Sequence, residues 1–352
     1  QLAAAGVAVT LRTARYPGAP RRDVVDGVCI DRVGGRYTVY LWALAALVGA
    51  RLGLGPLRRV RPDVVIDTQN GLPFLARLVY GRRVAVLVHH CHRAQWPVAG
   101  PAQSRVGWWV ESQLSPRLHR RNQYLTVSLP SARDLVDLGV DRERIAVVRN
   151  GLDEAPAGTR AGERSPTPRV VVLSRLVPHK QIEDALDAVA ALRHRVPQLH
   201  LDVVGDGWWR DRLVEHAAGL GIADVVTFHG HVDEDTKHRL LQRSWVQVLP
   251  SRKEGWGLAV IEAAQHGVPT IGYRSSGGLC DSIIDGVTGL LVDDHDQLVD
   301  GLAQLLADPV LRDQLGGKAQ ARSAEFSWRQ SADAMRAVLE AVYAGERLSG
   351  VI

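Results

Sequence analysis

The chain has 352 residues, of which 46% are hydrophobic and 23% charged; this is the composition of a globular protein, and the length suffices for two domains with separate cores. Three cysteines far apart in the sequence exclude a disulfide framework, and no apolar run of transmembrane length and no signal peptide is visible, so we expect a cytoplasmic protein. The net charge of +5 divides into +12 for residues 1–150 and −7 for residues 151–352, which predicts two domains with different partners.

The basic first half carries none of the patterns that bind nucleic acid. It has no interleaving of basic and aromatic residues, and neither a helix-turn-helix nor a zinc-finger spacing. We therefore expect no nucleic acid as a partner. The basic surface is expected to face an anionic acceptor, or to make peripheral contact with an anionic membrane.

The first half alternates strand-length apolar runs with helical patterns. Residues 2–5 look like the end of a helix that leads into a strand at residues 7–11, so we expect a further N-terminal segment before this chain. Apolar runs follow at residues 64–67, 84–89, 124–128 and 145–148. Their nearly continuous apolarity predicts parallel strands covered on both faces. A helical pattern between the last two has Ser131 as its predicted N-cap.

The apolar stretch at residues 40–48 has two interpretations. It is flanked by Arg51, Arg58, Arg59 and Arg61. Such a combination suits an interfacial patch for anionic lipid. A core helix with a solvated basic edge is the commoner structure, and we favour it slightly.

Residues 154–168 hold the densest cluster of Pro, Gly and Ser in the chain and predict a linker. A second alternating half follows, with strands expected at residues 170–174, 199–204, 225–228, 246–249, 270–273 and 290–292. Strand–helix alternation on both sides of a linker predicts an α/β protein with two Rossmann-like, doubly wound domains and a cleft between them. The last helix is predicted from about Trp328 to Tyr343.

The most informative run is residues 249–264, where a buried strand ends in a Gly-flanked turn with Glu254 and a helix then carries Glu262. Such a junction places backbone N–H groups at the tip of the sheet, where anionic groups bind in α/β proteins. Two carboxylates suit a polyhydroxylated ligand, because each oxygen accepts hydrogen bonds from vicinal hydroxyls. The run resembles the Glu-x7-Glu signature of the retaining glycosyltransferases of the GT-B fold, specifically family 4.

This resemblance covers essentially the whole chain. It implies an N-terminal acceptor-side domain (residues 1–153) that lacks its first strand and Gly-rich loop, the linker (154–168), a nucleotide-sugar-binding domain (169–326), and a C-terminal helix (327–352) that crosses back to the first domain. It also implies a hexosyltransferase of cell-envelope or glycoconjugate biosynthesis. The enzyme would move a hexose from a nucleoside-diphosphate sugar to an unidentified lipid, glycan or small-molecule acceptor.

The resemblance also implies roles for matching residues. Glu254 would hold the sugar and Glu262 the ribose hydroxyls. Arg175 and Lys180, at the tip of the first strand of the second domain, would stabilise the departing diphosphate. Further donor contacts are implied for Trp256, Gly257, Leu258, Gly205, Asp206, Gly207 and Val232. With cations in the electrostatic role, we expect metal-independent chemistry and no cofactor besides the donor substrate.

The sequence His89-His90-Cys91-His92 invites a metal-site interpretation. Neighbouring residues of a strand point to opposite faces, so these side chains are not expected to converge on one ion. The family commonly places a histidine after this strand, near the reacting carbon. The resemblance therefore implies a catalytic role for His89, with His90 or His92 as alternatives.

Two other classes of protein stay open. One is a nucleotide-sugar 2-epimerase of the same fold, which would convert the donor without any acceptor. The other is a catalytically silent nucleotide-sugar-binding or scaffold subunit. A phosphorylase of this fold would require a pyridoxal-bearing lysine site, which the sequence does not show.

Overall fold

The computed structural model describes residues 1–93, 96, 100–156 and 163–352, and the chain divides into two compact units. Unit 1 comprises residues 1–151 and 328–352, and unit 2 comprises residues 152–327. Residues 157–162 of the predicted linker lie outside the described residues. The C-terminal end of the linker packs on unit 2. There the Trp245 indole donates a hydrogen bond of 2.8 Å to the Ser165 carbonyl.

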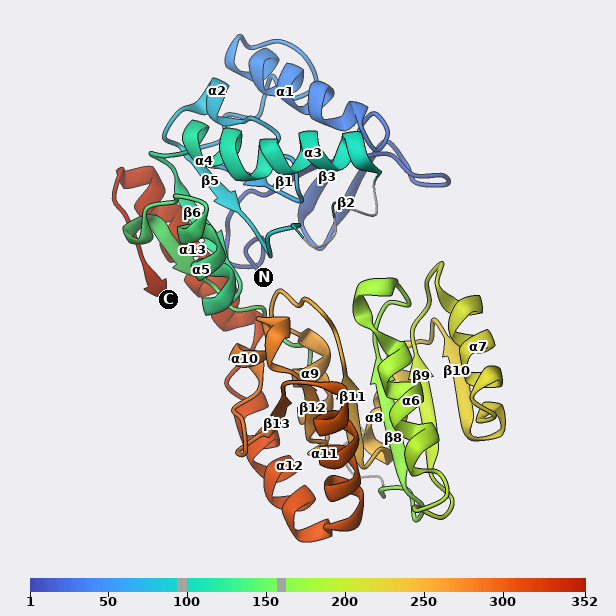
Figure 1. Ribbon diagram of the computed structural model, residues 1–352. Coiled ribbons are helices and arrows are strands. Elements are labelled where there is room, and N and C mark those ends of the chain that lie inside the picture. Colours follow the sequence, from blue (N-terminus) through green and yellow to red (C-terminus); the bar gives the residue numbers. More distant parts are fainter. Residues whose placement is uncertain (94–95, 97–99, 157–162) are drawn as a thin grey trace. The chain divides into compact units, whose positions relative to one another are not determined.

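Unit 1 contains two sheets (Figure 1). The smaller has the order β1-β3-β2, and the larger is parallel with the order β14-β7-β6-β5-β4. The strands are β1 (Thr10–Thr13), β2 (Arg22–Val25), β3 (Val28–Arg32), β4 (Val65–Thr68), β5 (Val84–Leu87), β6 (Gln123–Thr126), β7 (Ile145–Val147) and β14 (Gly350–Val351). The helices are α1 (Thr38–Arg51), α2 (Arg77–Tyr80), α3 (Pro101–Trp109), the π-helix η2 (Val110–Leu114), α4 (Ser115–Leu118), α5 (Leu129–Asp137), the 3-10 turn η3 (Arg142–Arg144) and α13 (Trp328–Ala344).

Alternate residues of the parallel strands in unit 1 enter two different cores. Val84 and Val86 of β5 pack with Leu135 of α5 on one face of the sheet. Ala85 between them packs on the other face, with Val338 of α13. The C-terminal helix therefore forms part of unit 1, and the middle of the sheet is covered on both faces, which is why β5 and β7 are apolar at every position.

Unit 2 is built on one six-stranded parallel sheet with the order β10-β9-β8-β11-β12-β13. Its strands are β8 (Arg169–Leu173), β9 (His200–Val204), β10 (Val226–Gly230), β11 (Val246–Leu249), β12 (Thr270–Tyr273) and β13 (Gly289–Val292). Its helices are α6 (Ile182–Leu192), α7 (Arg210–Gly219), α8 (Glu234–Arg243), α9 (Leu258–Ala264), α10 (Leu279–Ser282), α11 (His295–Ala307) and α12 (Pro309–Ser323), with 3-10 turns η4 (Pro178–Lys180), η5 (Ala223–Val225) and η6 (Arg274–Ser276).

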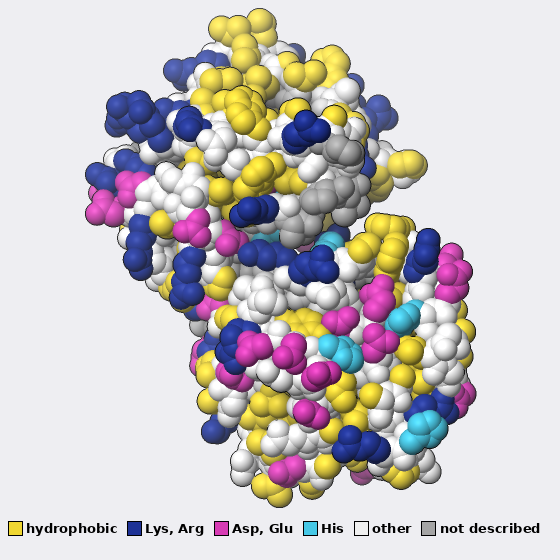
Figure 2. All heavy atoms as spheres, in the orientation of Figure 1, with side chains coloured by type: hydrophobic (Ala, Val, Ile, Leu, Met, Phe, Trp, Pro, Cys, Tyr) yellow, Lys and Arg dark blue, Asp and Glu magenta, His cyan; other side chains and the backbone are white. Residues whose placement is uncertain are grey.

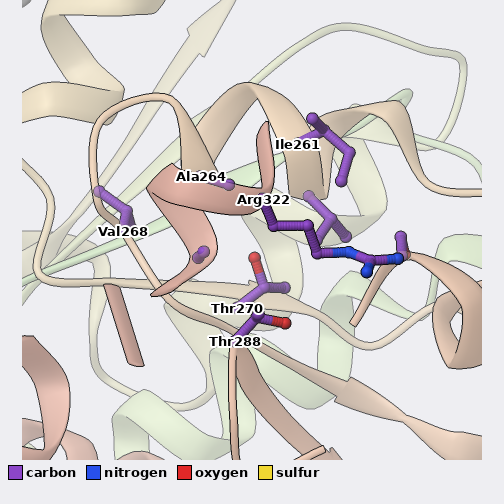
Figure 3. A pocket seen from close by; sticks show the side chains of 9 residues that line it. Ile261, Ala264, Val268, Thr270, Thr288 and Arg322 are labelled. Atoms are coloured by element: carbon purple, nitrogen blue, oxygen red, sulfur yellow. The ribbon is translucent and has the colours of Figure 1, made fainter. Parts of the chain in front are cut away.

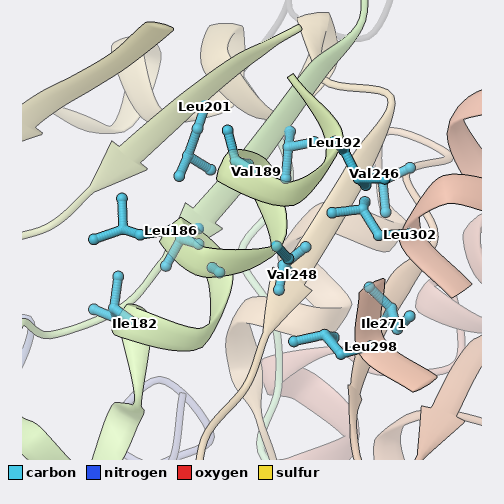
Figure 4. Close-up of a cluster of buried hydrophobic side chains, with 14 of the residues drawn as sticks. Ile182, Leu186, Val189, Leu192, Leu201, Val246, Val248, Ile271, Leu298 and Leu302 are labelled. Atoms are coloured by element: carbon cyan, nitrogen blue, oxygen red, sulfur yellow. The ribbon is translucent and has the colours of Figure 1, made fainter. Parts of the chain in front are cut away.

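The main core of unit 2 lies between the sheet and α6, α7 and α11 (Figure 4). Val170 and Val172 of β8 point into this core, whereas Val171 points to the opposite face, toward Leu241 of α8 and Ala263 of α9. Full burial of a Val or Leu side chain contributes about 1.5–3 kcal/mol, so this double-sided packing fixes the strands whose tips carry the predicted site.

Every strand predicted from residue 64 onward in these two parallel sheets is present, with bounds that differ by at most two residues. Two local predictions need correction. The predicted strand at residues 7–11 is found at Thr10–Thr13. The N-cap of α5 is Ser128 rather than Ser131, since the Ser128 side chain accepts a hydrogen bond from the Ser131 N–H. Pro130 fits the first turn because a residue there needs no N–H partner, so the helix starts one turn earlier.

The sequence reasoning missed the hairpin of β2 and β3. Val25 pairs with Val28 in antiparallel register, and Asp26 and Gly27 form the two-residue connection with φ of 48° and 79°. Asp-Gly is the preferred dipeptide for a turn in which both central residues have positive φ. The signal was therefore present in the sequence.

Candidate functional site

The turn with Glu254, between β11 and α9, is fastened by its backbone to a second turn. The Glu254 N–H donates to the Ser276 carbonyl over 3.0 Å, and the Gly278 N–H donates to the Glu254 carbonyl over 3.2 Å. A Cβ on Gly278 would lie 2.6 Å from the Glu254 carbonyl oxygen, so only glycine allows this approach. The two Gly-rich turns after β11 and β12 thus form one structure at the carboxyl edge of the sheet.

Lys180 and Glu254 form an ion pair at this edge. Lys180 Nζ lies 2.5 Å from Glu254 Oε1, and Ser251 Oγ donates to the same carboxylate oxygen over 2.7 Å. Both charged side chains are largely buried, at 12% and 11% exposure. The Arg252 N–H also donates to the His179 carbonyl over 2.9 Å. The loop after β8 and the loop after β11 are therefore joined by backbone and side chains, and two of the predicted site residues meet.

Positive charge gathers around this ion pair. Burial lowers the pKa of His179, and the charges of Lys180 and Arg175 lower it further. The His179 imidazole is therefore neutral at physiological pH. Arg175 is exposed and, within the part of the chain that the structure describes, forms no ion pair. The site thus holds one cation bound to a carboxylate and a second that is available to an anionic ligand.

The turn of Gly205, Asp206 and Gly207 packs directly against the loop after β8. A Cβ on Gly205, where φ is 125°, would lie 1.9 Å from the Ser174 carbonyl oxygen, and one on Gly207 would lie 2.1 Å from the Leu176 carbonyl oxygen. The Leu176 N–H also donates to the Asp206 carbonyl over 3.0 Å. Both glycines are needed for this packing, whatever else the turn does.

Glu262 has a cation of its own. Lys237 Nζ of α8 lies 2.6 Å from Glu262 Oε1 and also 2.6 Å from Glu234. Burial lowers the pKa of Lys237, but the hydrogen bonds to these two carboxylates outweigh it and leave the pKa raised. The carboxylates of the Glu-x7-Glu run are thus each paired with a different lysine. No local sequence signal points to Lys237.

The remaining predicted donor residues flank α9 or follow β10. Trp256 is 2% exposed and its ring packs edge-on against Phe326 at 4.8 Å, so its side chain is structural. Gly257 precedes α9 with φ of 89°, and Leu258 is 38% exposed. Val232 packs against the core cluster on the α8 and α9 face of the sheet.

A small hollow lies behind α9, lined by residues that include Ile261, Thr270 and Thr288 (Figure 3). The side chain of Arg322 enters it, and Arg322 Nη2 donates to the Asp281 carbonyl over 2.9 Å. Neither Glu254 nor Lys180 lines it. This hollow is therefore separate from the ion-paired site.

His89, His90 and His92 of unit 1 follow β5, and His92 is held by a residue that the sequence reasoning missed. The carboxylate of Glu111, buried in η2, accepts hydrogen bonds from the His92 N–H (2.9 Å), from His92 Nδ1 (3.1 Å) and from Trp96 Nε1 (2.7 Å). The rings of His90 and His92 are 4.4 Å apart. Burial, and then the charge of His92, lower the pKa of His89. Among the described residues, no group of three or more His, Cys, Asp or Glu side chains has metal-binding geometry.

Two α/β units on parallel sheets are the architecture of the GT-B fold, and the family models and relatives below identify the class as a glycosyltransferase. Residues 1–156 match the model described as "Glycosyltransferase Family 4", and residues 159–322 match "Glycosyl transferases group 1". The chain belongs to family 4 of the glycosyltransferases. It transfers a glycosyl group from a sugar donor to an acceptor.

Similar proteins include glycogen synthase of Mycobacterium tuberculosis, 31% identical over 331 residues, which span 87% of this chain and 77% of that protein. The GDP-mannose-dependent alpha-(1-6)-phosphatidylinositol monomannoside mannosyltransferase of Mycolicibacterium smegmatis is 33% identical over 248 residues, covering 67% of this chain and 64% of the relative. The D-inositol 3-phosphate glycosyltransferase of Nocardia farcinica is 31% identical, covering 73% and 60%. The relatives are named as a synthase and two transferases, which does not favour the epimerase or scaffold alternatives.

Solved structures show the same fold. Sucrose-phosphate synthase from Thermosynechococcus elongatus has a TM-score of 0.79 at 20% identity, covering 98% of this chain and 91% of that one. WaaG, a glycosyltransferase involved in lipopolysaccharide biosynthesis, has a TM-score of 0.73 at 15% identity, covering 96% and 92%. Among the described residues, no helix is both long and apolar enough to cross a membrane.

Proposed function

We propose that the donor is a nucleoside-diphosphate hexose and that unit 2 binds it at the carboxyl edge of its sheet. The observation that carries this proposal is the buried Lys180–Glu254 ion pair beside the exposed Arg175. A diphosphate needs cations, and a hexose needs hydrogen-bond acceptors for its hydroxyls. This site places both within one pair of joined loops. A GDP-mannose-dependent relative supports the same donor class.

In the proposed reaction, the bond between the anomeric carbon and the diphosphate oxygen breaks, and its electron pair leaves on that oxygen. The acceptor hydroxyl oxygen forms the new bond to the anomeric carbon, and its proton passes to the departing diphosphate. Because negative charge develops on the leaving group, Arg175 and Lys180 stabilise the transition state more than the ground state. These cations take the electrostatic role without a metal ion, and attack on the same face retains the anomeric configuration.

Donor binding changes the partner of Lys180. In the structure Lys180 is bound to Glu254 Oε1. A diphosphate carries more negative charge than the Glu254 carboxylate, so Lys180 would move to the diphosphate. The carboxylate oxygens of Glu254 would then be available to accept hydrogen bonds from the sugar hydroxyls. Glu262, fixed by Lys237, would accept from the ribose hydroxyls.

The other donor contacts carry over from the family pattern. The backbone of Trp256, Gly257 and Leu258 would meet the sugar or phosphate. The turn of Gly205, Asp206 and Gly207 would line the nucleotide pocket, and so would Val232. The catalytic role of His89 in unit 1 stays a prediction.

The test is to incubate the protein with UDP-, GDP- and dTDP-hexoses and follow nucleotide release with and without candidate acceptors. Acceptor-dependent release supports the proposal, and the anomeric configuration of the product is read by NMR. Conversion of the donor without an acceptor would show an epimerase, and binding without any turnover would show a scaffold.

Two variants test the residue roles. Lys180→Met should weaken nucleoside-diphosphate binding by about 10-fold or more, the loss of one charge-assisted contact. Glu254→Gln should retain nucleotide binding but lose about 100-fold in turnover, since it contacts the sugar. The exposed Lys318→Met, on α12, is the matched control and should behave as the parent protein. Unchanged affinity and turnover in Lys180→Met would rule out its role.

A further inference from the structure

The outer face of α1 is a continuous apolar stripe. The helix buries Val39, Ala43, Ala46 and Ala50 against unit 1. At 100° per residue, the outward positions fall within an arc of about 140°. The exposed residues within this arc are Thr38 and the apolar residues Tyr37, Leu41, Trp42, Ala45, Val48 and Leu52, and Arg51 is exposed beside it. One face of α1 therefore packs in the core, as favoured from the sequence, and the opposite apolar face is exposed.

The exposure of this stripe is large. Leu41 is 72% exposed, Leu52 67% and Trp42 54%. Figure 2 shows hydrophobic side chains gathered over α1, with Lys and Arg side chains around them. Single exposed apolar residues are ordinary, but a contiguous apolar patch rimmed by charge marks an interaction surface.

The segment that carries the stripe is basic. Between Asp31 and Asp63 the sequence has six arginines and no acidic residue. Four of these arginines follow or end the helix and are exposed: Arg51, Arg58, Arg59 and Arg61. No carboxylate in that segment neutralises them. A second copy of this chain would bring two such rims together, and the repulsion of like charges opposes that pairing.

We propose that α1 lies in the plane of an anionic lipid surface, with Leu41, Trp42 and Val48 in the acyl boundary and the arginines at the headgroups. An apolar face combined with a positive rim is the pattern of an interfacial helix. Each exposed arginine near an anionic surface adds to the attraction, and the negative charge needed to balance Arg51, Arg58, Arg59 and Arg61 is that of the lipid headgroups. This inference rests on unit 1 alone and is independent of the proposed donor chemistry.

The experiment is co-sedimentation of the full chain with vesicles made of equal parts of phosphatidylcholine and phosphatidylglycerol, compared with vesicles of phosphatidylcholine only. We expect binding to the anionic vesicles, and weaker binding as salt is raised. Leu41→Ser should lower the partition constant about 10-fold, since one buried leucine is lost. Arg58→Glu should lower it by about 25-fold on anionic vesicles, because the change removes one favourable charge and adds an unfavourable one.

Val106→Ser is the matched control, an exposed valine (63%) on α3 of the same unit, and it should leave binding unchanged. Circular dichroism checks that all three variants are folded. The proposal is overturned if the parent chain does not bind anionic vesicles, or if Leu41→Ser and Val106→Ser bind equally. It is also overturned if light scattering shows that Leu41→Ser dissociates an oligomer while vesicle binding stays unchanged.

Discussion

Replacing Lys180 by methionine should destabilise unit 2 even in the absence of any ligand, because Lys180 is already ion-paired there. Breaking a fully buried pair costs about 3–5 kcal/mol, and breaking an exposed pair costs about 0–1 kcal/mol. Lys180 and Glu254 are 12% and 11% exposed, and Ser251 remains as a donor to the carboxylate. We therefore expect a loss of about 2 kcal/mol.

This loss is measurable as a melting temperature. For a domain of this size each kcal/mol corresponds to about 2–4 °C, so Lys180→Met should melt about 6 °C lower than the parent. The double variant Lys180→Met with Glu254→Gln should recover part of the loss, since a neutral amide needs no cationic partner. Calorimetry of the single and double variants, without nucleotide, gives the coupling free energy.

The expected coupling between the two changes is about 1–2 kcal/mol. Lys318→Met should melt with the parent, because Lys318 is exposed. Strictly additive effects of the two substitutions, or a melting temperature of Lys180→Met equal to that of the parent, would refute the ion pair as a stabilising contact of unit 2.

Three further changes are expected to have defined effects. Gly205→Ala should destabilise unit 2 by more than about 2 kcal/mol in urea unfolding, because its Cβ would lie 1.9 Å from a backbone oxygen. The control is Gly219→Ala in α7, where the new Cβ meets open space, and it should be neutral or stabilising in the same assay. Glu111→Gln should cost about 1–3 kcal/mol in urea unfolding, because it weakens three hydrogen bonds at once, whereas Glu143→Gln at an exposed site should not. Burial lowers the pKa of His119 from 6.5, against an opposing carboxylate. As the pH falls, His119 therefore takes up a proton in the unfolded chain before it does so in the folded protein. The free energy of unfolding should consequently fall as the pH drops below about 6.5, and this fall should be less steep in His119→Gln.

The sequence was sufficient for the central strands of the parallel sheets because both faces of those strands are covered. Val170 to Val172 enter two cores in alternation, and a strand apolar at every position has few other interpretations. The β2–β3 hairpin had weaker evidence, since Val24 is 66% exposed and alternation is hard to recognise in four residues. Its Asp-Gly turn was the only clear signal.

In the candidate site, too, residues in a local pattern were predictable from the sequence, and residues that make their contact from another element were not. Glu254 was predicted because a glycine-bounded turn after an apolar strand is a local pattern, and Lys180 because two cations follow the tip of another apolar strand; the structure pairs Glu254 with Lys180. The partners Lys237 and Glu111 were not predicted, because each reaches its contact from a different element. Nothing in the residues that neighbour Glu111 in the sequence distinguishes a buried glutamate on the π-helix η2 from a solvent-exposed one.

The apolar segment 40–48 shows where periodicity stops being informative. A helix that is apolar on nearly all sides satisfies both a core position and an interfacial one, because each requires the same residue types around the axis. What separates the two is the size of the side chains on each face. The inner face of α1 is mainly small, with Ala43, Ala46 and Ala50, whereas the outer face carries the large Leu41 and Trp42. Because these large side chains are exposed, they leave much apolar area in water. A partner that removes this area gains about 25 cal/mol per Å².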